Sequence, residues 1–393
     1  MVPPRLYVTS PEKIKRGELS DVYFPRAREV LVKMGLTEKH VVADIHSYSL
    51  PRDHEWAVLA GIEEAAYLLE GYDIDADAMA EGTIFRRYEP LVSISGSYTE
   101  FGVLEPSLLG VLRHSSSIAT RAARCKKAAK DKSLVFFGIR AVHPLITPLA
   151  DRAAFIGGCN AVSGTIGAEM IGEKPVGTMP HALILVFEDQ VKAWKTFDET
   201  MDPDVPRIAL CDTLYDEKIE ALMAAKALGE RLYGVRLDTP SSRRGDFREI
   251  AWETRWALDI NGFEQVKIFL SGGLNEYNLE NLLDVADGFG VGTSIAFPPS
   301  VDMAMDIVEV NKRPYSKKGK LSGKKQVYRC TKCFQDKMVP EKVSVEKCPW
   351  CRAEVEPLLK PLIRQGEIVM DLPNARDIRS YVLQQLDKVD LQL

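Results

Sequence analysis

The sequence predicts an α/β protein whose centre is an irregular, incomplete barrel of parallel strands. The first observation is a row of seven short apolar segments between residues 134 and 291, alternating with helical patterns. The second is that nearly every segment ends on a polar, charged or glycine-rich signature. The third is a pair of C-x2-C motifs in the last quarter of the chain. Since the loops after parallel strands form one face of a barrel, chemistry is expected there.

The N-terminal part, residues 1–115, has the pattern of an α+β domain that residues 301–325 complete. A long helix over 108–129 has a strongly basic end, which suits a helix C-terminus. The other elements expected in this part are helices over 29–34 and 56–69 and strands over 82–85 and 91–94.

The barrel is predicted over residues 116–300, because short apolar strands alternating with helices call for a parallel sheet. The seventh strand runs directly into Phe297-Pro298-Pro299, which favours an incomplete barrel over an eightfold one. A doubly wound open sheet is the alternative. Strands are expected over 134–139, 156–159, 175–178, 207–211, 233–237, 266–270 and 287–291. Helices are expected over 145–155, 163–171, 182–200, 216–228, 247–259 and 279–285.

A zinc ribbon is predicted over residues 326–356. Two C-x2-C pairs can present four thiolates to one ion, which satisfies tetrahedral Zn²⁺ with no open position. The predicted ligands are Cys330, Cys333, Cys348 and Cys351. The site is therefore structural, and redox-active cysteines are the alternative. An alternating strand is expected over 301–310, and a tail over 357–393 carries a helix from 375 to 386.

The charge of the chain is unevenly distributed. The 393 residues carry a net charge of -5, yet residues 311–347 hold twelve Lys/Arg and three Asp/Glu, which leaves -14 for the rest. A basic module can bind nucleic acid or anionic ligands, or form a solvated surface. No apolar run approaches a membrane span, and the start resembles no signal peptide, so we expect a cytoplasmic protein without a membrane partner.

Two glycine-rich strand ends are candidates for phosphate binding. Glycines let backbone N–H groups approach phosphate oxygens closely, and a neighbouring hydroxyl can assist. Phosphate sites on barrels often use the last two strand ends, although glycine turns after strands are common. The two segments are Ser271-Gly272-Gly273 and Gly290-Val291-Gly292-Thr293.

Charged residues at the other strand ends are candidates for binding and catalysis. Asp212 and Asp238 can bind ribose hydroxyls, hold Mg²⁺ or stabilise positive charge, or else cap a helix. Arg140 and Arg236 can bind phosphate or carboxylate, or form ordinary ion pairs. His181 opens a predicted helix and can serve as acid, nucleophile or phosphate ligand, or be purely structural.

Together these motifs resemble the nicotinate phosphoribosyltransferases, in a short archaeal-type form with a C-terminal zinc ribbon. Their superfamily also contains quinolinate and nicotinamide phosphoribosyltransferases. The motifs that carry the resemblance are Phe137-Gly138-Ile139-Arg140, Gly177-Thr178-Met179-Pro180-His181, Cys211-Asp212-Thr213, Val235-Arg236-Leu237-Asp238 and the two glycine segments. After Asp238 the chain departs from the family's Ser-Gly-Asp-Pro and reads Thr239-Pro240-Ser241-Ser242.

The resemblance implies an N-terminal α/β sandwich and a seven-stranded barrel, in a homodimer or higher homo-oligomer with shared active sites. It implies that nicotinate and phosphoribosyl pyrophosphate give nicotinate mononucleotide and pyrophosphate, with Mg²⁺ and coupled ATP hydrolysis. Quinolinate phosphoribosyltransferase, which decarboxylates its substrate and uses no ATP, is the nearest alternative. A nucleic-acid-binding zinc-ribbon protein ranks well below, because it leaves the strand ends unexplained.

The resemblance also implies roles for single residues. His181 matches the phosphorylated histidine of the family. Phe137 matches the aromatic residue stacked on the pyridine ring, and Tyr23 the one from the partner subunit. Asn160 falls near the base. The groups matched to the phosphoribosyl and pyrophosphate moieties are Arg140, Thr178, Asp212, Arg236, Asp238, Ser271, Gly272, Gly273, Gly290, Gly292 and Thr293.

Overall fold

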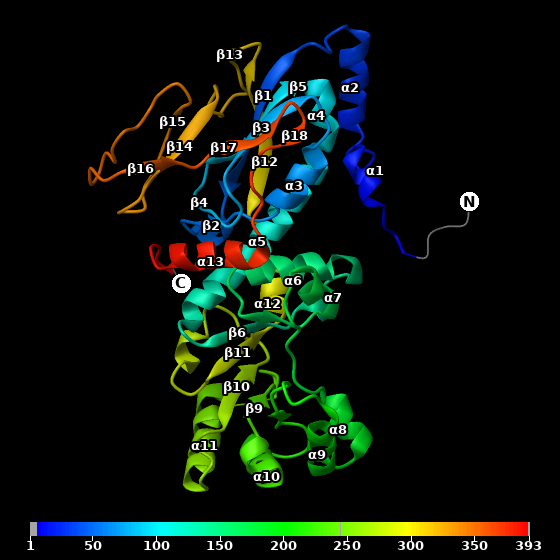
Figure 1. Ribbon diagram of the computed structural model, residues 1–393, viewed down its shortest axis with the longest axis vertical. Coiled ribbons are helices and arrows are strands. Elements are labelled where there is room, and N and C mark those ends of the chain that lie inside the picture. The colour runs from blue at the N-terminus through cyan, green and yellow to red at the C-terminus, as the bar shows by residue number, and fades with distance from the viewer. Residues whose placement is uncertain (1–5, 244, 392–393) are drawn as a thin grey trace. The chain divides into compact units, whose positions relative to one another are not determined.

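The computed structural model describes residues 6–243 and 245–391, which fall into two units with a sheet in each (Figure 1). The first unit combines the chain up to Thr120 with the chain from Pro299 onward, and the second is Arg121–Pro298. None of the helices in the described ranges has the length and apolar character that a membrane span requires.

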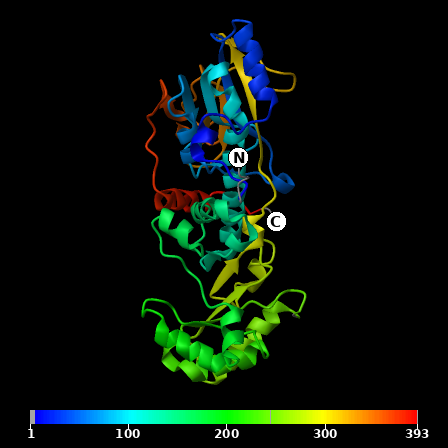
Figure 2. The ribbon, with the colours of Figure 1, turned by 90° about the vertical axis from the view of Figure 1, so that its right-hand side faces the viewer.

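The first unit is built on a seven-stranded sheet in the order β13-β12-β1-β5-β3-β17-β18. Strand β12 pairs antiparallel with β1, so a segment from the end of the chain completes the N-terminal sheet. Figure 2 shows this yellow strand among the blue and cyan ones. The strands are β1 (His40–Ser49), β3 (Ile74–Ala78), β5 (Pro90–Ser97), β12 (Asp302–Val310), β13 (Arg313–Pro314), β17 (Lys360–Arg364) and β18 (Glu367–Ile368).

Helices α3 and α5 supply the apolar side chains that cover this sheet. Ile62 and Leu69 of α3 and Leu108 and Leu112 of α5 are fully buried in the same core as the strands. The helices of this part are α1 (Pro11–Lys15), α2 (Tyr23–Lys33), α3 (Ile62–Leu69), α4 (Tyr98–Phe101) and α5 (Glu105–Ala129), and β2 (Ala57–Val58) pairs with β4 (Ile84–Phe85).

The C-terminal part of the chain, expected to be a helical tail, also contributes strands to the main sheet. A three-stranded ribbon sheet comes first, and β17 and β18 then join the main sheet by pairing with β3 and with each other. The two strands are short, and their local sequence gave no sign of a partner 280 residues away. The remaining elements are β14 (Lys325–Cys330), β15 (Asp336–Pro340), β16 (Val355–Pro357) and α13 (Ala375–Leu386).

The second unit holds a parallel sheet in the order β7-β6-β11-β10-β9-β8. The first strand, β6, pairs with the last, β11, as a barrel requires. Six strands are assigned in its described residues: β6 (Ser133–Phe136), β7 (Ala161–Val162), β8 (Ile208–Leu210), β9 (Gly234–Leu237), β10 (Lys267–Ser271) and β11 (Gly288–Val291). The helices are α6 (Thr147–Ile156), α7 (Thr165–Met170), α8 (His181–Phe187), α9 (Gln190–Thr200), α10 (Glu217–Leu228), α11 (Phe247–Ile260) and α12 (Thr293–Ala296).

Four local predictions for the barrel were wrong. The segment 156–159, expected to be a strand, is the end of α6 followed by a turn, and β7 begins only at Ala161. Residues 175–178 form no strand. Pro175 has no N–H to donate, and the segment is joined to β7 by a backbone hydrogen bond from the Val176 N–H to the Val162 carbonyl oxygen, at 2.9 Å. The helix expected over 182–200 is two helices, because Glu188 takes a left-handed conformation and Asp189 caps α9. The segment 279–285 contains only a short 3₁₀ turn, Glu280–Leu282.

A buried carboxylate between α6 and α7 predicts a pH dependence of stability. Asp151 is fully buried, and a Cβ at Gly164 or Gly167 would overlap its side chain. Burial raises the pKa of Asp151 to about 6, and the N–H of Gly164 offsets part of this. The folded state therefore holds this proton more tightly than the unfolded chain.

We expect the free energy of unfolding to fall as the pH rises from about 4 to about 6. Asp151→Asn should remove about 1–3 kcal/mol of that fall, measured by denaturant unfolding across this range. Glu169→Gln, at an exposed carboxylate of α7, is the matched control. Identical pH profiles for Asp151→Asn and the parent protein would contradict the prediction.

Candidate active site

The ring of His181 lies between two carboxylates that follow neighbouring strands. Its Nε2 is 3.8 Å from Asp212 Oδ1, after β8, and 3.7 Å from Asp238 Oδ2, after β9. Its Nδ1 is 3.1 Å from the hydroxyl oxygen of Thr213. His181 begins α8 and its side chain is 40% exposed, so a ligand in solvent can reach the ring.

Asp212 is held by the loop that follows β9. Its side chain is 2% exposed, and its Oδ2 accepts the N–H of Asp238 at 2.8 Å and the hydroxyl of Thr239 at 3.1 Å. Burial raises the pKa of Asp212, and the Asp238 N–H and the nearby His181 act against this. The carboxylate is thus fixed in position, with Oδ1 turned toward the imidazole.

Arg236 connects four parts of the site. Its guanidinium pairs with Asp238 at 3.0 Å and donates to Ser271 Oγ at 2.8 Å and to Thr178 Oγ1 at 3.0 Å. Its guanidinium carbon also lies 5.0 Å from the centre of the Phe137 ring. Ser271 in turn donates to Asp238 at 2.6 Å. The ion pair expected as the structural alternative for Arg236 is therefore present, inside the candidate site.

The predicted glycine loops line a pocket at the same strand ends. Its volume is about 230 Å³, and a second cavity of about 430 Å³ shares several of its residues and continues between the strands. Gly272 and Gly273 adopt left-handed backbone angles, and a Cβ on Gly272 would lie 2.8 Å from the carbonyl oxygen of Asp238. The predicted residues that line the smaller pocket are Phe137, Arg140, Arg236, Asp238, Ser271, Gly272, Gly273, Gly290, Gly292 and Thr293.

Two predicted residues lie elsewhere. Asn160 is next to the start of β7, and its Oδ1 accepts the N–H of Leu134 at 3.0 Å, near the N-terminal ends of the strands. The structure therefore places it at the opposite ends of the strands from this pocket. Tyr23 begins α2 in the other unit, is 59% exposed and donates to Asp21 at 3.2 Å.

Two glutamates at the start of α10 were missed by the sequence reasoning. Glu217 accepts the hydroxyl of Thr239 at 2.7 Å, and Glu220 accepts backbone N–H groups of the loop after β8. Their spacing of three residues in the first turns of a helix, just after a strand-end aspartate, was the available signal. It is also the ordinary composition of a helix N-terminus, so it did not stand out.

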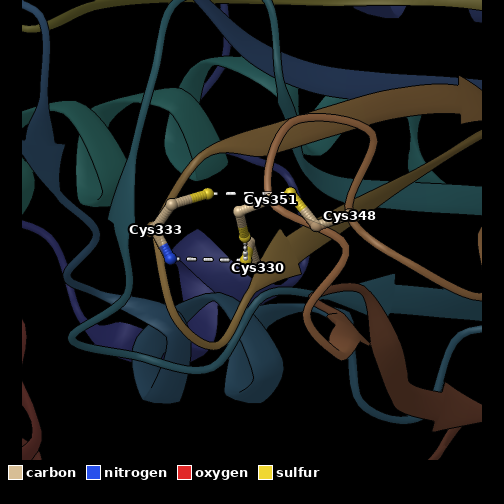
Figure 3. Close-up of side chains that lie close together, drawn as sticks. All are labelled: Cys330, Cys333, Cys348 and Cys351. Carbon is tan, nitrogen blue, oxygen red and sulfur yellow. Dashed lines mark hydrogen bonds between the residues drawn. The ribbon is translucent and has the colours of Figure 1, made fainter.

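The four predicted zinc ligands converge on one point at the end of β14 (Figure 3). Their sulfur atoms all lie within 4.8 Å of one another, and two pairs are 3.4 and 3.6 Å apart. Tetrahedral zinc, with Zn–S bonds of about 2.3 Å, requires sulfurs about 3.8 Å apart. Burial raises the pKa of Cys330, but hydrogen bonds from the N–H groups of Cys333 and Lys332 outweigh this and lower the pKa to about 6. The donor set fits a metal such as zinc.

Five of the twelve Lys and Arg residues in the basic segment around this ribbon form ion pairs within their own unit. Lys317 and Lys320 both contact Asp306, at 2.7 and 2.8 Å. Further pairs join Lys324 to Asp77, Lys325 to Asp44 and Arg329 to Asp336. Three carboxylates from outside the segment, Asp44, Asp77 and Asp306, therefore offset part of its +9 charge, which weakens the case for a nucleic-acid surface.

Family models match nearly the whole chain. Residues 21–116 and 118–306 match the N-terminal and C-terminal domains of quinolinate phosphoribosyl transferase, and 323–393 match the nicotinate phosphoribosyltransferase C-terminal domain. A crystal structure of nicotinate-nucleotide pyrophosphorylase from Pyrococcus furiosus is 55% identical, with a TM-score of 0.97 over all of both chains. The chain belongs to the nicotinate phosphoribosyltransferase family. It is an enzyme of the phosphoribosyltransferase type.

Curated relatives of this phosphoribosyltransferase carry the nicotinate name. A nicotinate phosphoribosyltransferase of Mycobacterium tuberculosis is 29% identical over 97% of this chain and 84% of its own length. One from Bacillus subtilis is 28% identical over 70% of this chain, and the match spans only 62% of that relative. The structure of human nicotinic acid phosphoribosyltransferase shares the fold. It is 20% identical in sequence, with a TM-score of 0.76 over 95% of this chain and 94% of its own.

Proposed function

We propose that this enzyme joins nicotinate to phosphoribosyl pyrophosphate, giving nicotinate mononucleotide and pyrophosphate, with coupled ATP hydrolysis. The observation that carries the proposal is the histidine between two carboxylates beside a pocket with two glycine loops. The nicotinate phosphoribosyltransferase domain over residues 323–393 and the names of the curated relatives support nicotinate as the acceptor.

The pocket offers separate places for the phosphate and for the base. Backbone N–H groups of the segments 271–273 and 290–293 are suited to the ribose 5-phosphate, and a side chain at Gly272 would overlap the carbonyl oxygen of Asp238 and so displace the first loop. The face of Phe137, with Arg236 nearby, is suited to a planar anionic pyridine. Nicotinate is such a ring, so its nitrogen would be directed toward C1 of the ribose.

In the proposed reaction the pyridine nitrogen attacks ribose C1, and the bond from C1 to the pyrophosphate oxygen breaks with its electron pair. No proton has to be removed from the nucleophile, so positioning does most of the work. Asp212 and Asp238 face the developing positive charge of the ribose and would also hold Mg²⁺. When bound, Mg²⁺ supplies charge neutralisation for the pyrophosphate.

His181 is proposed as the residue that ATP phosphorylates. The ring is accessible to a ligand, and the two carboxylates near Nε2 can keep it oriented. A phosphoryl group there would add about 1.5–2 negative charges beside Asp212 and Asp238. That repulsion would favour release of the anionic product, which links ATP hydrolysis to turnover.

Steady-state assays with nicotinate or quinolinate, each with and without ATP, test the function. We expect turnover of nicotinate, raised by ATP and accompanied by ADP, and acid-labile ³²P labelling from γ-labelled ATP that His181→Ala abolishes. Turnover of quinolinate with release of CO₂ and no effect of ATP would reject the nicotinate assignment. Equal labelling of His181→Ala and the parent protein would reject the phosphohistidine.

Quinolinate phosphoribosyl transfer is the second candidate, because the two larger family models bear that name. Against it, those models end at residue 306, whereas the nicotinate-type domain accounts for 323–393. The four assays above separate the two acids directly.

We further propose that Zn²⁺ occupies the cysteine cluster.

We also propose that the enzyme acts as a homodimer or higher homo-oligomer, with Tyr23 reaching the partner's site. The exposed ring of Tyr23 is available for such a contact. Mixing Tyr23→Ala and His181→Ala chains should then restore about a quarter of the parental activity by subunit exchange. A mixture as inactive as each variant alone would argue against shared sites.

A further inference from the structure

A single buried carboxylate organises the loop between β8 and α10. Three consecutive backbone N–H groups, from Thr213, Leu214 and Tyr215, donate to Glu220 at 2.9, 2.6 and 2.7 Å. Glu220 is fully buried, whereas the side chains of Leu214 and Tyr215 are 46% and 61% exposed. The loop is therefore fixed through its backbone, by bonds to one charged acceptor.

We propose that Glu220 is a positioning residue for His181, acting through Thr213; the proposal rests on the phosphohistidine function above. Thr213 contacts both Glu220 and His181. Its N–H donates to Glu220 Oε2, and its hydroxyl oxygen lies 3.1 Å from His181 Nδ1. The hydrogen bond at one ring nitrogen sets the tautomer and orientation of the imidazole, and so the presentation of the other nitrogen.

The two carboxylate oxygens of Glu220 accept hydrogen bonds from different residues of the loop, so a substitution can remove one set of bonds and keep the other. Oε2 accepts the Thr213 N–H, while Oε1 accepts those of Leu214 and Tyr215. In Glu220→Gln the carbonyl oxygen can keep the two bonds from Leu214 and Tyr215, which places the NH₂ group against the Thr213 N–H. Two donors then face each other, so the bond to Thr213 is lost.

Glu217 forms a parallel connection on the other side of the site. Its Oε1 accepts the Thr239 hydroxyl at 2.7 Å, and that hydroxyl also reaches Asp212 at 3.1 Å. The first turns of α10 thus reach Asp212 by one route and His181 by another. The route through Glu220 reaches Nδ1 of the imidazole by a hydrogen bond from Thr213, whereas the route through Glu217 ends on Asp212, whose Oδ1 lies 3.8 Å from Nε2.

The experiment compares Glu220→Gln, Thr213→Val and the double variant, with Glu230→Gln at an exposed carboxylate as control. We expect each single variant to slow ³²P labelling of His181 by about 10- to 100-fold, with KM for nicotinate nearly unchanged. The double variant should be no slower than the worse single one, because both changes break the same connection. The nitrogen chemical shifts and titration midpoint of His181, followed by NMR, should move in both single variants and not in Glu230→Gln.

Independent, multiplicative losses in the double variant, or an unchanged His181 NMR signal in Glu220→Gln, would overturn the proposal. If Glu220→Gln fails to fold, Thr213→Val still tests the connection, because the valine removes only the hydroxyl. Absence of labelling in the parent enzyme would reject the phosphohistidine, and the NMR comparison would then decide the role of Glu220 alone.

Discussion

Replacing Arg236 by leucine is expected to lower kcat/KM for phosphoribosyl transfer by about 10²- to 10³-fold, as loss of a preorganised electrostatic group typically does. The guanidinium bonds to Asp238, Ser271 and Thr178 and lies beside the ring of Phe137. Its loss removes one positive charge from the place proposed for an anionic substrate and leaves Asp238 without its cationic partner.

Steady-state kinetics with nicotinate as acceptor measure this effect. Arg236→Lys should recover only part of the activity, because an ammonium group cannot hold the three partners in the planar arrangement of a guanidinium. Arg248→Gln, which breaks a solvent-exposed pair with Asp284, is the control and should leave the kinetics unchanged. A loss for Arg236→Leu of less than about threefold would show that the site does not depend on this charge.

Removing the metal from the cysteine cluster is expected to have the largest effect on the structure. The ribbon has only three short strands, and apart from the cysteines its buried apolar residues are few, with Val327 and Phe334 among them. A module of this size cannot fold on its core alone, so the proposed zinc ion would provide much of its folding free energy. Cys348→Ser should therefore lose the bound zinc and unfold residues 326–356.

Zinc content by mass spectrometry and limited proteolysis at the ribbon lysines provide the two readouts. The parent protein should carry one zinc per chain and resist cleavage at Lys332 and Lys337, whereas Cys348→Ser should not. Ser344→Ala, an exposed position of the same ribbon, should behave like the parent. A metal-free parent protein that still resists cleavage would show that the cysteines are not a structural metal site.

Unfolding of the ribbon in Cys348→Ser should also affect neighbouring elements through Arg329, which precedes Cys330 in the chain. This buried arginine bonds Asp336 of β15, the carbonyl of Ile84 in β4 and the side chain of Gln385 in α13. Unfolding of the ribbon would remove these bonds together. We therefore expect the proteolysis pattern of Cys348→Ser to include new cuts near α13.

The sequence was sufficient where a pattern is local. The strand ends at Asp212 and Asp238, the glycine segments and the cysteine pairs were all found from residue type and spacing, and the structure brings each set together. Parallel strands deliver their C-terminal ends to the same edge, so finding the strands also predicted the side on which the site lies. The helix over 375–386 was predicted to the residue.

The tertiary structure decided every question that depends on a partner distant in the sequence. Asn160 was placed near the base by analogy, yet its side chain bonds Leu134 at the other end of the strands. Residues 175–178 look like a strand locally, but they do not pair as one. Strand β17 pairs with β3, which lies about 280 residues earlier in the chain.

The sequence by itself thus determined the parallel strand-and-helix alternation, the four clustered thiols and the chemical character of the candidate active-site edge. Only the tertiary structure showed that Arg236 joins Asp238, Ser271 and Thr178, and that Glu220 holds the loop beside His181. The physical reason is that periodicity and residue chemistry are properties of a short segment. Hydrogen-bond partners depend on register and packing, which are set when distant segments meet.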